Sequence, residues 1–365
     1  KYFDITLSSY QDSDEHQFIE DERRLLYVAF TRAKSQLYVS HAKVHTDGKE
    51  LIAARLLEEI DEQYMSSVSS DAFEKTFSMT QSLEQSMPTI KIDPKLLHTV
   101  VLERGFSATS LNNYLRSPWD YLYRNVLRIP ETQPAHMQYG TAVHNTLEYV
   151  TRYHTSNGSF PNEQLVKNKL ETELQRLPLT EDEYHSLREK GIEELFVYLG
   201  HLHAVLPPDT KEELTIKVWL PTGIPELPEV KLTGKLDRID LNERKEAVRV
   251  VDYKTGKPKS RNVIEGNTKD SDGGYKRQLV FYALLLDLYD DKRFKTNIGT
   301  LSFVQPTPKG DVKEEQFTIE ESEIESLKEE IIQAVADILD GSFLRSPCNE
   351  NESDYCQYVS QLFSR

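Results

Sequence analysis

The order of strand-forming segments in the second half of the chain limits the possible folds most strongly. Apolar and polar residues alternate over 213–220, 230–241 and 247–254, as expected for strands with one buried face. Only the polar connection "NERKEA", centred on Arg244 and Lys245, separates the second segment from the third. Because a connection this short cannot carry a crossover, these two segments are predicted to form an antiparallel hairpin.

Helical patterns lie on both sides of these strands. Before them we expect a helix over 107–127 broken near Pro118, a helix over 139–153 capped by Thr141, and two polar helices within 161–204. After them we expect a helix over 275–289, strands near 298–304 and 314–319, and an amphipathic helix over about 320–340. This order of elements, with helices, a meander of strands, a helix and further strands, indicates an α/β or α+β domain.

The first 104 residues differ in character from the rest. Leu25, Val28 and Ala29 recur at helical spacing before an apolar segment at 36–40, "QLYVS", that predicts a strand. A second helix is predicted over 50–64. Residues 65–104 are rich in Ser, Thr and Gln and indicate a linker. We therefore divide the chain into 1–45, 46–104 and 105–365. Because it opens with Lys1 in a strand-like segment, we expect it to be part of a longer protein.

The net charge of −16 argues against a uniformly basic nucleic-acid binder. DNA is still a possible partner, because an acidic nuclease can keep a local basic track. Such a track lies within 253–277, which contains seven basic residues and three acidic ones. The basic residues are Lys254, Lys257, Lys259, Arg261, Lys269, Lys276 and Arg277, and the acidic residues are Glu265, Asp270 and Asp272. A solvated loop would have the same composition, but contiguity with Lys254 favours contact with a DNA backbone.

Targeting signals and cysteines indicate the compartment. No apolar run approaches the roughly 18 residues of a membrane helix, and no signal peptide is visible. Two cysteines, Cys348 and Cys356, cannot make a disulfide framework. We expect both to be inert thiols in a reducing cytoplasm.

The predicted hairpin brings two carboxylates together. A turn centred on Arg244 and Lys245 places Asp237 directly opposite Asp252, with Cα atoms roughly 4.5–5.5 Å apart. Facing like charges are destabilising unless a cation lies between them, and carboxylate and carbonyl oxygens are the ligands that Mg²⁺ or Mn²⁺ prefers. The period of two along a strand then puts Lys254 on the same face as Asp252, where its ammonium can stabilise charge on a phosphate.

Taken alone, each of these residues has a simpler explanation. Asp-x-Lys occurs six times in the chain, starting at Asp47, Asp93, Asp209, Asp252, Asp290 and Asp311, so a solvated strand end accounts equally well for a single occurrence. His144 can be a further ligand or an ordinary helix histidine, and the same choice applies to Glu148 one turn later. Gln278 and Tyr282, four apart, can line the site or only pack the hairpin.

In combination and order, these residues resemble a known family. "YGTAVH", "GKLDRID", "VVDYKTG" and "QLVFY" look like the PD-(D/E)XK nuclease domain of RecB- and AddA/AddB-type enzymes, over about 105–365. The resemblance implies a mixed central sheet flanked by helices. It also implies His144, Asp237, Asp252 and the carbonyl of Tyr253 as metal ligands, Lys254 as the catalytic lysine, and Gln278 and Tyr282 as active-site residues.

The start of the chain resembles a second family. "EDERRLLYVAFTRAK" looks like the last signature motif of UvrD/Rep-type DNA helicases, which implies that Arg32 contacts the γ-phosphate of ATP when the rest of the motor is present. The sequence has no GxxxxGK[ST] phosphate loop, so we expect no ATP hydrolysis by this chain alone. A helicase end followed by a RecB-like nuclease is the order found in helicase-nucleases.

These resemblances lead to one main hypothesis with two alternatives. The main one is a Mg²⁺-dependent deoxyribonuclease, the C-terminal part of an ATP-dependent helicase-nuclease. It acts on single-stranded ends in recombinational repair, together with the rest of the motor and a second subunit as candidate partners. The alternatives are a catalytically silent nuclease fold used for DNA binding or docking, and a motor fragment that completes an ATPase in trans. Some relatives hold an iron–sulfur cluster, but Ser117 replaces its first cysteine and two cysteines cannot supply four thiolates, so we expect none.

Overall fold

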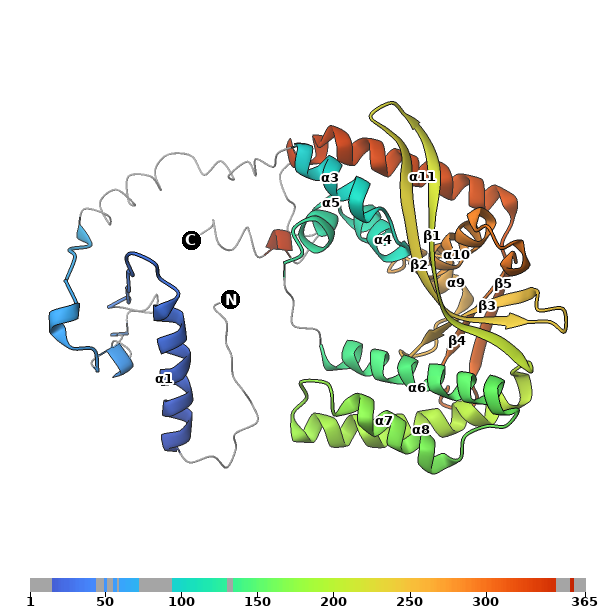
Figure 1. The fold of residues 1–365 in the computed structure, drawn as a ribbon, viewed down its shortest axis with the longest axis horizontal. Helices are drawn as coiled ribbons and strands as arrows, with labels where there is room; N and C mark the ends of the chain where they lie inside the picture. Colours follow the sequence, from blue (N-terminus) through green and yellow to red (C-terminus); the bar gives the residue numbers. More distant parts are fainter. Residues whose placement is uncertain are drawn as a thin grey trace. The chain divides into compact units, whose positions relative to one another are not determined.

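The computed structural model describes residues 15–43, 49–50, 55–57, 59–71, 94–129, 134–345 and 355–357. The chain divides into two compact units, Lys1–Gln85 and Ser86–Arg365 (Figure 1). None of the described helices combines the length and the apolar character that crossing a membrane requires.

The first unit contains helix α1 (Glu15–Thr31) and two short 3-10 turns, Arg55–Leu57 and Glu62–Tyr64. The strand predicted at 36–40 is wrong, because these residues are irregular and exposed. Strand structure depends on hydrogen bonds to a neighbouring strand, and residues 36–40 pair with no described residue. The continuous helix predicted over 50–64 is also wrong, since its described residues form only the two turns.

The second unit is built on one mixed five-stranded sheet with the order β1-β2-β3-β4-β5. Its strands are β1 (Asp209–Ile224), β2 (Leu227–Leu241), β3 (Ala247–Lys254), β4 (Ile298–Phe303) and β5 (Lys313–Thr318). Neighbours are antiparallel except β3 and β4, which are parallel. A parallel pair needs a crossover, and here it runs through α9 (Arg261–Ile264) and α10 (Gly274–Leu288). The sequence-based strands are thus confirmed, with β1 and β2 longer than predicted.

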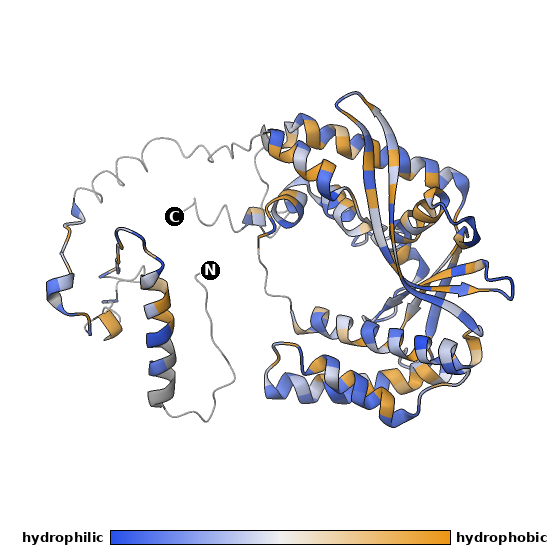
Figure 2. Ribbon diagram, viewed as in Figure 1, coloured by the Kyte–Doolittle hydropathy of each residue, from blue (hydrophilic) through white to orange (hydrophobic). Residues whose placement is uncertain are grey.

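Helices cover both faces of the sheet (Figure 1). One layer contains α3 (Pro94–Arg104), α4 (Ala108–Arg116), α5 (Pro118–Tyr121), α10 and α11 (Glu321–Asp340), and the other contains α6 (Ala135–Asn157), α7 (Glu163–Leu174) and α8 (Glu181–Val205). Successive strand residues point to opposite faces, so Val250 packs in the first core, and Val251 and Tyr253 pack in the second. Figure 2 shows the apolar residues on the strands and helices that meet in these cores.

Most helix predictions are confirmed, with two corrections. The break at Pro118 is present, because Ser117 ends α4 and caps α5, and a π-helical turn follows at Leu122–Val126. Thr141 is not a cap, because α6 already begins at Ala135 behind Pro134.

The second correction concerns the last residues of the segment predicted to be a linker. Residues 94–104 form α3, which buries Leu97, Val100 and Val101 in the first core. Beyond it, the Phe106 N–H donates to the Lys231 carbonyl at 2.8 Å, which ties the end of α3 to β2.

Candidate active site

The β2–β3 hairpin sets the position of the two aspartates. Arg238 pairs with Val251 and Asp240 with Arg249, so the ladder ends one residue before Asp237 and Asp252. The register shifts between Asp240 and Leu241, nearer the turn. The predicted hairpin and its register up to Arg238 and Val251 are therefore confirmed, and the pairing of the two aspartates themselves stays a prediction.

Asp237 is held by a histidine and by a main-chain donor. Its Oδ2 lies 3.3 Å from Nδ1 of His144 on α6 and accepts a 2.9 Å hydrogen bond from the Tyr253 N–H. Burial acts to raise the pKa of Asp237, but the hydrogen bond and charge of His144, with the Tyr253 N–H, lower it below its usual value. The pKa of His144 is raised, because its contact with Asp237 outweighs burial. Asp237 is thus kept as a carboxylate.

Asp252 lies deeper, and its environment has the opposite effect. The residue is only 2% exposed. Burial raises its pKa, the ammonium of Lys254 opposes this effect, and the charge of Asp237 adds to it. Tyr282 donates a 3.1 Å hydrogen bond to Oδ1, and Lys254 Nζ lies 2.6 Å from Oδ2. The two carboxylates are therefore not equivalent.

Helix α10 supplies the side chains that surround this acid. Lys254 Nζ donates to Gln278 Oε1 at 2.7 Å, and Gln278 Nε2 donates to the Tyr282 hydroxyl at 2.7 Å. Together with the contacts of Asp252, these bonds close a ring of four side chains: Lys254, Gln278, Tyr282 and Asp252. Burial and the nearby charge of Asp252 hold the pKa of Tyr282 well above its ordinary value, so its hydroxyl stays a donor.

All these residues line one pocket of about 350 Å³. Its walls are His144, Asp237, Asp252, Tyr253, Lys254, Thr255, Gly256, Tyr275, Gln278, Tyr282 and Phe303. The structure thus brings together every residue predicted for the nuclease site. Sequence reasoning missed Tyr275, although its place three residues before Gln278 on one helix could have indicated it. It also missed Phe303, whose pairing with Lys254 depends on the strand order.

Two residues near the site have other surroundings. Glu148 does not line the pocket and forms a 2.5 Å ion pair with Arg152 on the same helix. The Tyr253 ring lies in the second core, and its hydroxyl accepts a 2.8 Å hydrogen bond from the fully buried Arg238. Only the main chain of Tyr253 therefore contacts Asp237, and the role of its carbonyl stays a prediction.

The donor set suits a hard divalent cation. Asp252 Oδ2 is buried, and its close contact is the ion pair with Lys254 Nζ at 2.6 Å. His144 and Asp237 supply further nitrogen and oxygen donors in the same pocket. Within the described ranges, no three His, Cys, Asp or Glu side chains are gathered closely enough to form a ready-made metal site. Binding would thus require the ion pair to loosen.

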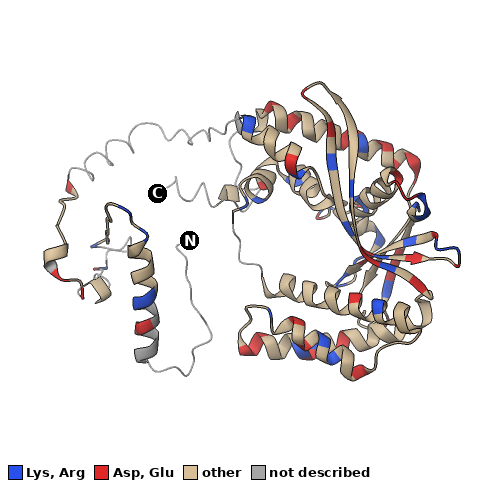
Figure 3. Ribbon diagram, in the orientation of Figure 1, with Lys and Arg blue, Asp and Glu red and all other residues tan. Residues whose placement is uncertain are grey.

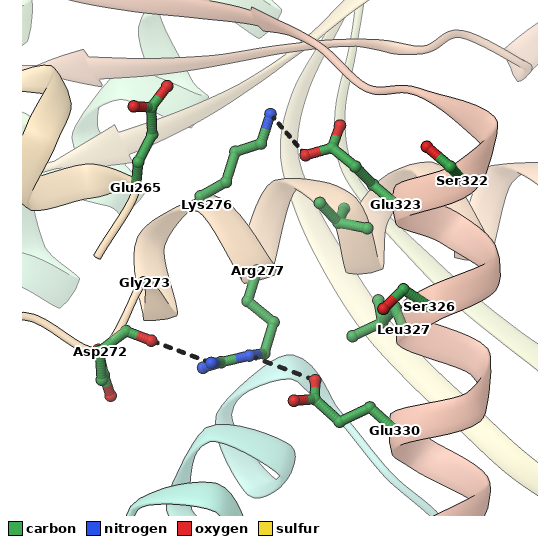
Figure 4. Close-up of a pocket in the computed structure, with 11 residues that line it drawn as sticks. Glu265, Asp272, Gly273, Lys276, Arg277, Ser322, Glu323, Ser326, Leu327 and Glu330 are labelled. Carbon is green, nitrogen blue, oxygen red and sulfur yellow. Dashed lines mark hydrogen bonds and ion pairs between the residues drawn. The ribbon is translucent and has the colours of Figure 1, made fainter. Parts of the chain in front are cut away.

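A second pocket, of about 370 Å³, lies on another side of α10, against α11 (Figure 4). Lys276 lies 3.3 Å from Glu323, and Arg277 lies 3.4 Å from Glu330. Arg277 also donates to the Asp272 carbonyl at 2.9 Å and, outside the view, to Asn112 Oδ1 at 2.7 Å. The cations of this pocket are therefore neutralised by carboxylates.

These pairs correct the interpretation of the basic track. Three basic residues of the track form ion pairs with acids: Lys276, Arg277 and Arg261. The last of these contacts Glu265 at 3.1 Å. Acidic and basic residues are likewise mixed over the helices (Figure 3). Lys257, Lys259 and Lys269 are exposed and form no ion pair with any described residue. The part of the track available to an anion is thus smaller than the sequence indicated.

Two predictions concern residues outside this pocket. Arg32 follows the end of α1 and is exposed, and its contact with ATP stays a prediction. Cys356 is fully buried and disulfide-bonded, so the expectation of two thiols is wrong. Among described residues no cysteine is free.

Two family models match this chain. The model of the PD-(D/E)XK nuclease superfamily matches residues 105–361, and that of the UvrD-like helicase C-terminal domain matches residues 3–44. A comparison with curated proteins gave no match. The solved structure "Crystal structure of SSO0001" is 15% identical over 73% of this chain and 93% of its own, with a TM-score of 0.27, too low to support an argument. With its UvrD-like segment in front, the chain belongs to the PD-(D/E)XK nuclease superfamily.

Proposed function

We propose that the chain is a metal-dependent deoxyribonuclease that hydrolyses phosphodiester bonds. The observation that carries this proposal is that Asp237 and Asp252 line one pocket together with Lys254. Two carboxylates in one pocket favour a cation, and the ammonium beside Asp252 favours an anionic substrate. Such a combination suits phosphate chemistry.

In this proposal the metal is Mg²⁺, with Mn²⁺ as an alternative. It would be held by His144, Asp237, Asp252 and the Tyr253 carbonyl. When bound, the cation activates water and offsets charge on the phosphate. His144 keeps Asp237 ionised through the 3.3 Å contact. Lys254 directs its ammonium into the pocket and stabilises negative charge that grows on the phosphate during cleavage.

Helix α10 orients these groups. Gln278 accepts from Lys254 and donates to Tyr282, so it fixes the direction of both side chains. Tyr282 donates to Oδ1 of Asp252, which leaves Oδ2 toward Lys254. A reacting group placed by such a network needs little rearrangement before the reaction.

DNA is the proposed substrate, in the form of a single-stranded end cut by an exonuclease. The exposed Lys257 and Lys259, directly after Lys254, are positioned to contact its phosphates. The UvrD-like segment supports a place in an ATP-dependent helicase-nuclease for recombinational repair, in which Arg32 contacts ATP once the rest of the motor is present. A second helicase-nuclease subunit is a further candidate partner. A cytoplasmic location is part of this proposal, although the disulfide at Cys356 gives it no support.

The test is a cleavage assay on the full chain with linear single- and double-stranded DNA labelled at either end. Mg²⁺, Mn²⁺ and EDTA are compared, with Asp252→Ala and Lys254→Ala as variants. We expect metal-dependent cleavage that both variants lose, and the position of the label in the products reports polarity and exonuclease mode. DNA binding without cleavage by the folded, unmodified chain would instead identify a catalytically silent DNA-binding module.

A further inference from the structure

The ring of Tyr275 lies against the ammonium of Lys254. The Nζ atom is 5.3 Å from the ring centroid, within the range of a cation–π contact. Tyr275 lines the same pocket as the two aspartates. We propose that Tyr275 is a positioning residue for cleavage, which holds Lys254 toward the phosphate through its aromatic face. This inference rests on the proposed function.

The placement of Tyr275 on α10 follows from helix geometry. It is the second residue of the helix, which begins at Gly274 behind Gly273 with a positive φ of 71°. Tyr275, Gln278 and Tyr282 are three and then four residues apart, so they fall on one helix face. They are also the α10 residues that line the pocket. The face of α10 that contacts Lys254 therefore extends one turn beyond the Gln278–Tyr282 pair.

The contacts of Lys254 show why a ring matters here. Its ammonium has three neighbours: Asp252 Oδ2 at 2.6 Å, Gln278 Oε1 at 2.7 Å and the Tyr275 ring. A cation bound at Asp252 competes with Lys254 for the same carboxylate. The contacts with Gln278 and Tyr275 do not depend on that oxygen. Once the site is loaded, these two side chains are thus what keeps the ammonium in place.

The ring, rather than the hydroxyl, carries the proposed role. The hydroxyl of Tyr275 forms no hydrogen bond with the described residues, whereas the face of the ring has the negative potential that attracts an ammonium. Tyr275 also packs against the first core, which is the simpler explanation for an aromatic residue at this position. The two explanations differ in what they predict for an aromatic and for an aliphatic replacement.

The experiment compares Tyr275→Phe with Tyr275→Leu in the full chain. Cleavage of labelled single-stranded DNA is measured with Mg²⁺, and DNA binding is measured separately in EDTA. We expect Phe to keep kcat within about twofold, and Leu to lower kcat by about 3–30-fold with KM and binding unchanged. The proposal is overturned if Leu retains kcat, if Phe loses as much as Leu, or if only KM changes.

A second series keeps the test valid if the Leu variant does not fold. Mono-, di- and trifluorinated phenylalanine at position 275 keep the shape of the ring while they withdraw electron density from its face. Under the proposal kcat falls stepwise with each fluorine, and thermal stability stays constant. A kcat independent of fluorination would overturn it. Absence of cleavage by the unmodified chain is a different result, because it contradicts the proposed nuclease and not the role of Tyr275 alone.

Discussion

Two pockets adjoin α10, and charged side chains line both, but the acids that meet the cations differ in how far they are exposed. On the side of α11, Lys276 and Arg277 meet Glu323 and Glu330, so that each cation has an acid. On the side of β3, two aspartates line one pocket with one lysine between α10 and the sheet. Compensated charges are typical of a structural contact. The side chains of Glu323 and Glu330 are 37% and 38% exposed, whereas those of Asp237 and Asp252 are 13% and 3% exposed. Two carboxylates withdrawn from solvent in one pocket cost stability and indicate a functional site.

The strongest test of the functional difference between the two pockets is to remove one charge from each. Asp252→Asn keeps the shape of the buried side chain but removes the charge that attracts a cation. We expect cleavage to fall by about 10³-fold. Glu323→Gln is the matched control in the other pocket, with activity within about twofold of the unmodified chain. Circular dichroism checks that both variants are folded. Equal losses in the two variants would contradict the functional distinction between the pockets.

Metal binding should distinguish the pockets without any measurement of activity. A ligand that binds only the folded state stabilises it, by about 2.7 kcal/mol at a concentration of 100 times Kd. We expect Mg²⁺ to raise the Tm of the unmodified chain and of Glu323→Gln, and to leave that of Asp252→Asn unchanged. Differential scanning fluorimetry with titrated Mg²⁺ measures this effect. A Tm increase that persists in Asp252→Asn would place the cation elsewhere.

Smaller effects are expected where a residue acts through another. Gln278→Ala removes the acceptor of Lys254 and the donor to Tyr282 while leaving both aspartates in place. We expect kcat to fall by about 10–100-fold, since both neighbours lose their orientation. Steady-state kinetics then show whether KM stays constant. A rise in KM alone would instead assign Gln278 to DNA binding.

Substitutions in the compensated pocket, the one between α10 and α11, should change the stability of the fold more than its activity. Arg277 links the loop before α10, α4 and α11 through Asp272, Asn112 and Glu330. Because these contacts are partly exposed, we expect Arg277→Ala to lower the free energy of unfolding by about 1–2 kcal/mol. Denaturant unfolding measures the loss, and activity of the folded variant should change less than threefold. Arg277→Lys, which retains the charge without the planar fork, is expected to recover only part of it.

Much of the pocket that contains the two aspartates was predictable from the sequence, because most of its predicted residues lie on neighbouring strands and on α10. Alternation and a short loop indicated that Asp237 faces Asp252. The register shift beside Asp240 shows that the hairpin is less regular than this reasoning assumed. Tyr275 belongs to the same helix face as Gln278 and was missed because an aromatic residue near a helix start has a simple packing explanation.

The other pocket was not predictable in this way. Glu323 and Glu330 lie on α11, far along the chain from Lys276 and Arg277, so the sequence showed cations without their partners. The predicted strand at 36–40 failed for a related reason. Its apolar residues fit a strand, but strand structure depends on a partner that the sequence of one segment does not identify. Local spacing in the sequence predicted contacts within one element or one hairpin. Contacts between elements far apart in the chain depend on long-range pairing, which local spacing does not show.

The smallest expected effect tests which lysines are available to DNA. Lys257 and Lys259 are exposed and unpaired within the described part of the chain, whereas Lys276 contacts Glu323. Each phosphate contact contributes about 0.7 to the salt dependence of single-strand binding, so Lys257→Gln with Lys259→Gln should lower the slope by about 1.4. Fluorescence anisotropy in EDTA at several salt concentrations measures it. Lys276→Gln should leave the slope unchanged, because its charge is already neutralised by an acid. A larger effect of Lys276 than of the two exposed lysines would mean that DNA binds over the compensated pocket and opens its ion pairs.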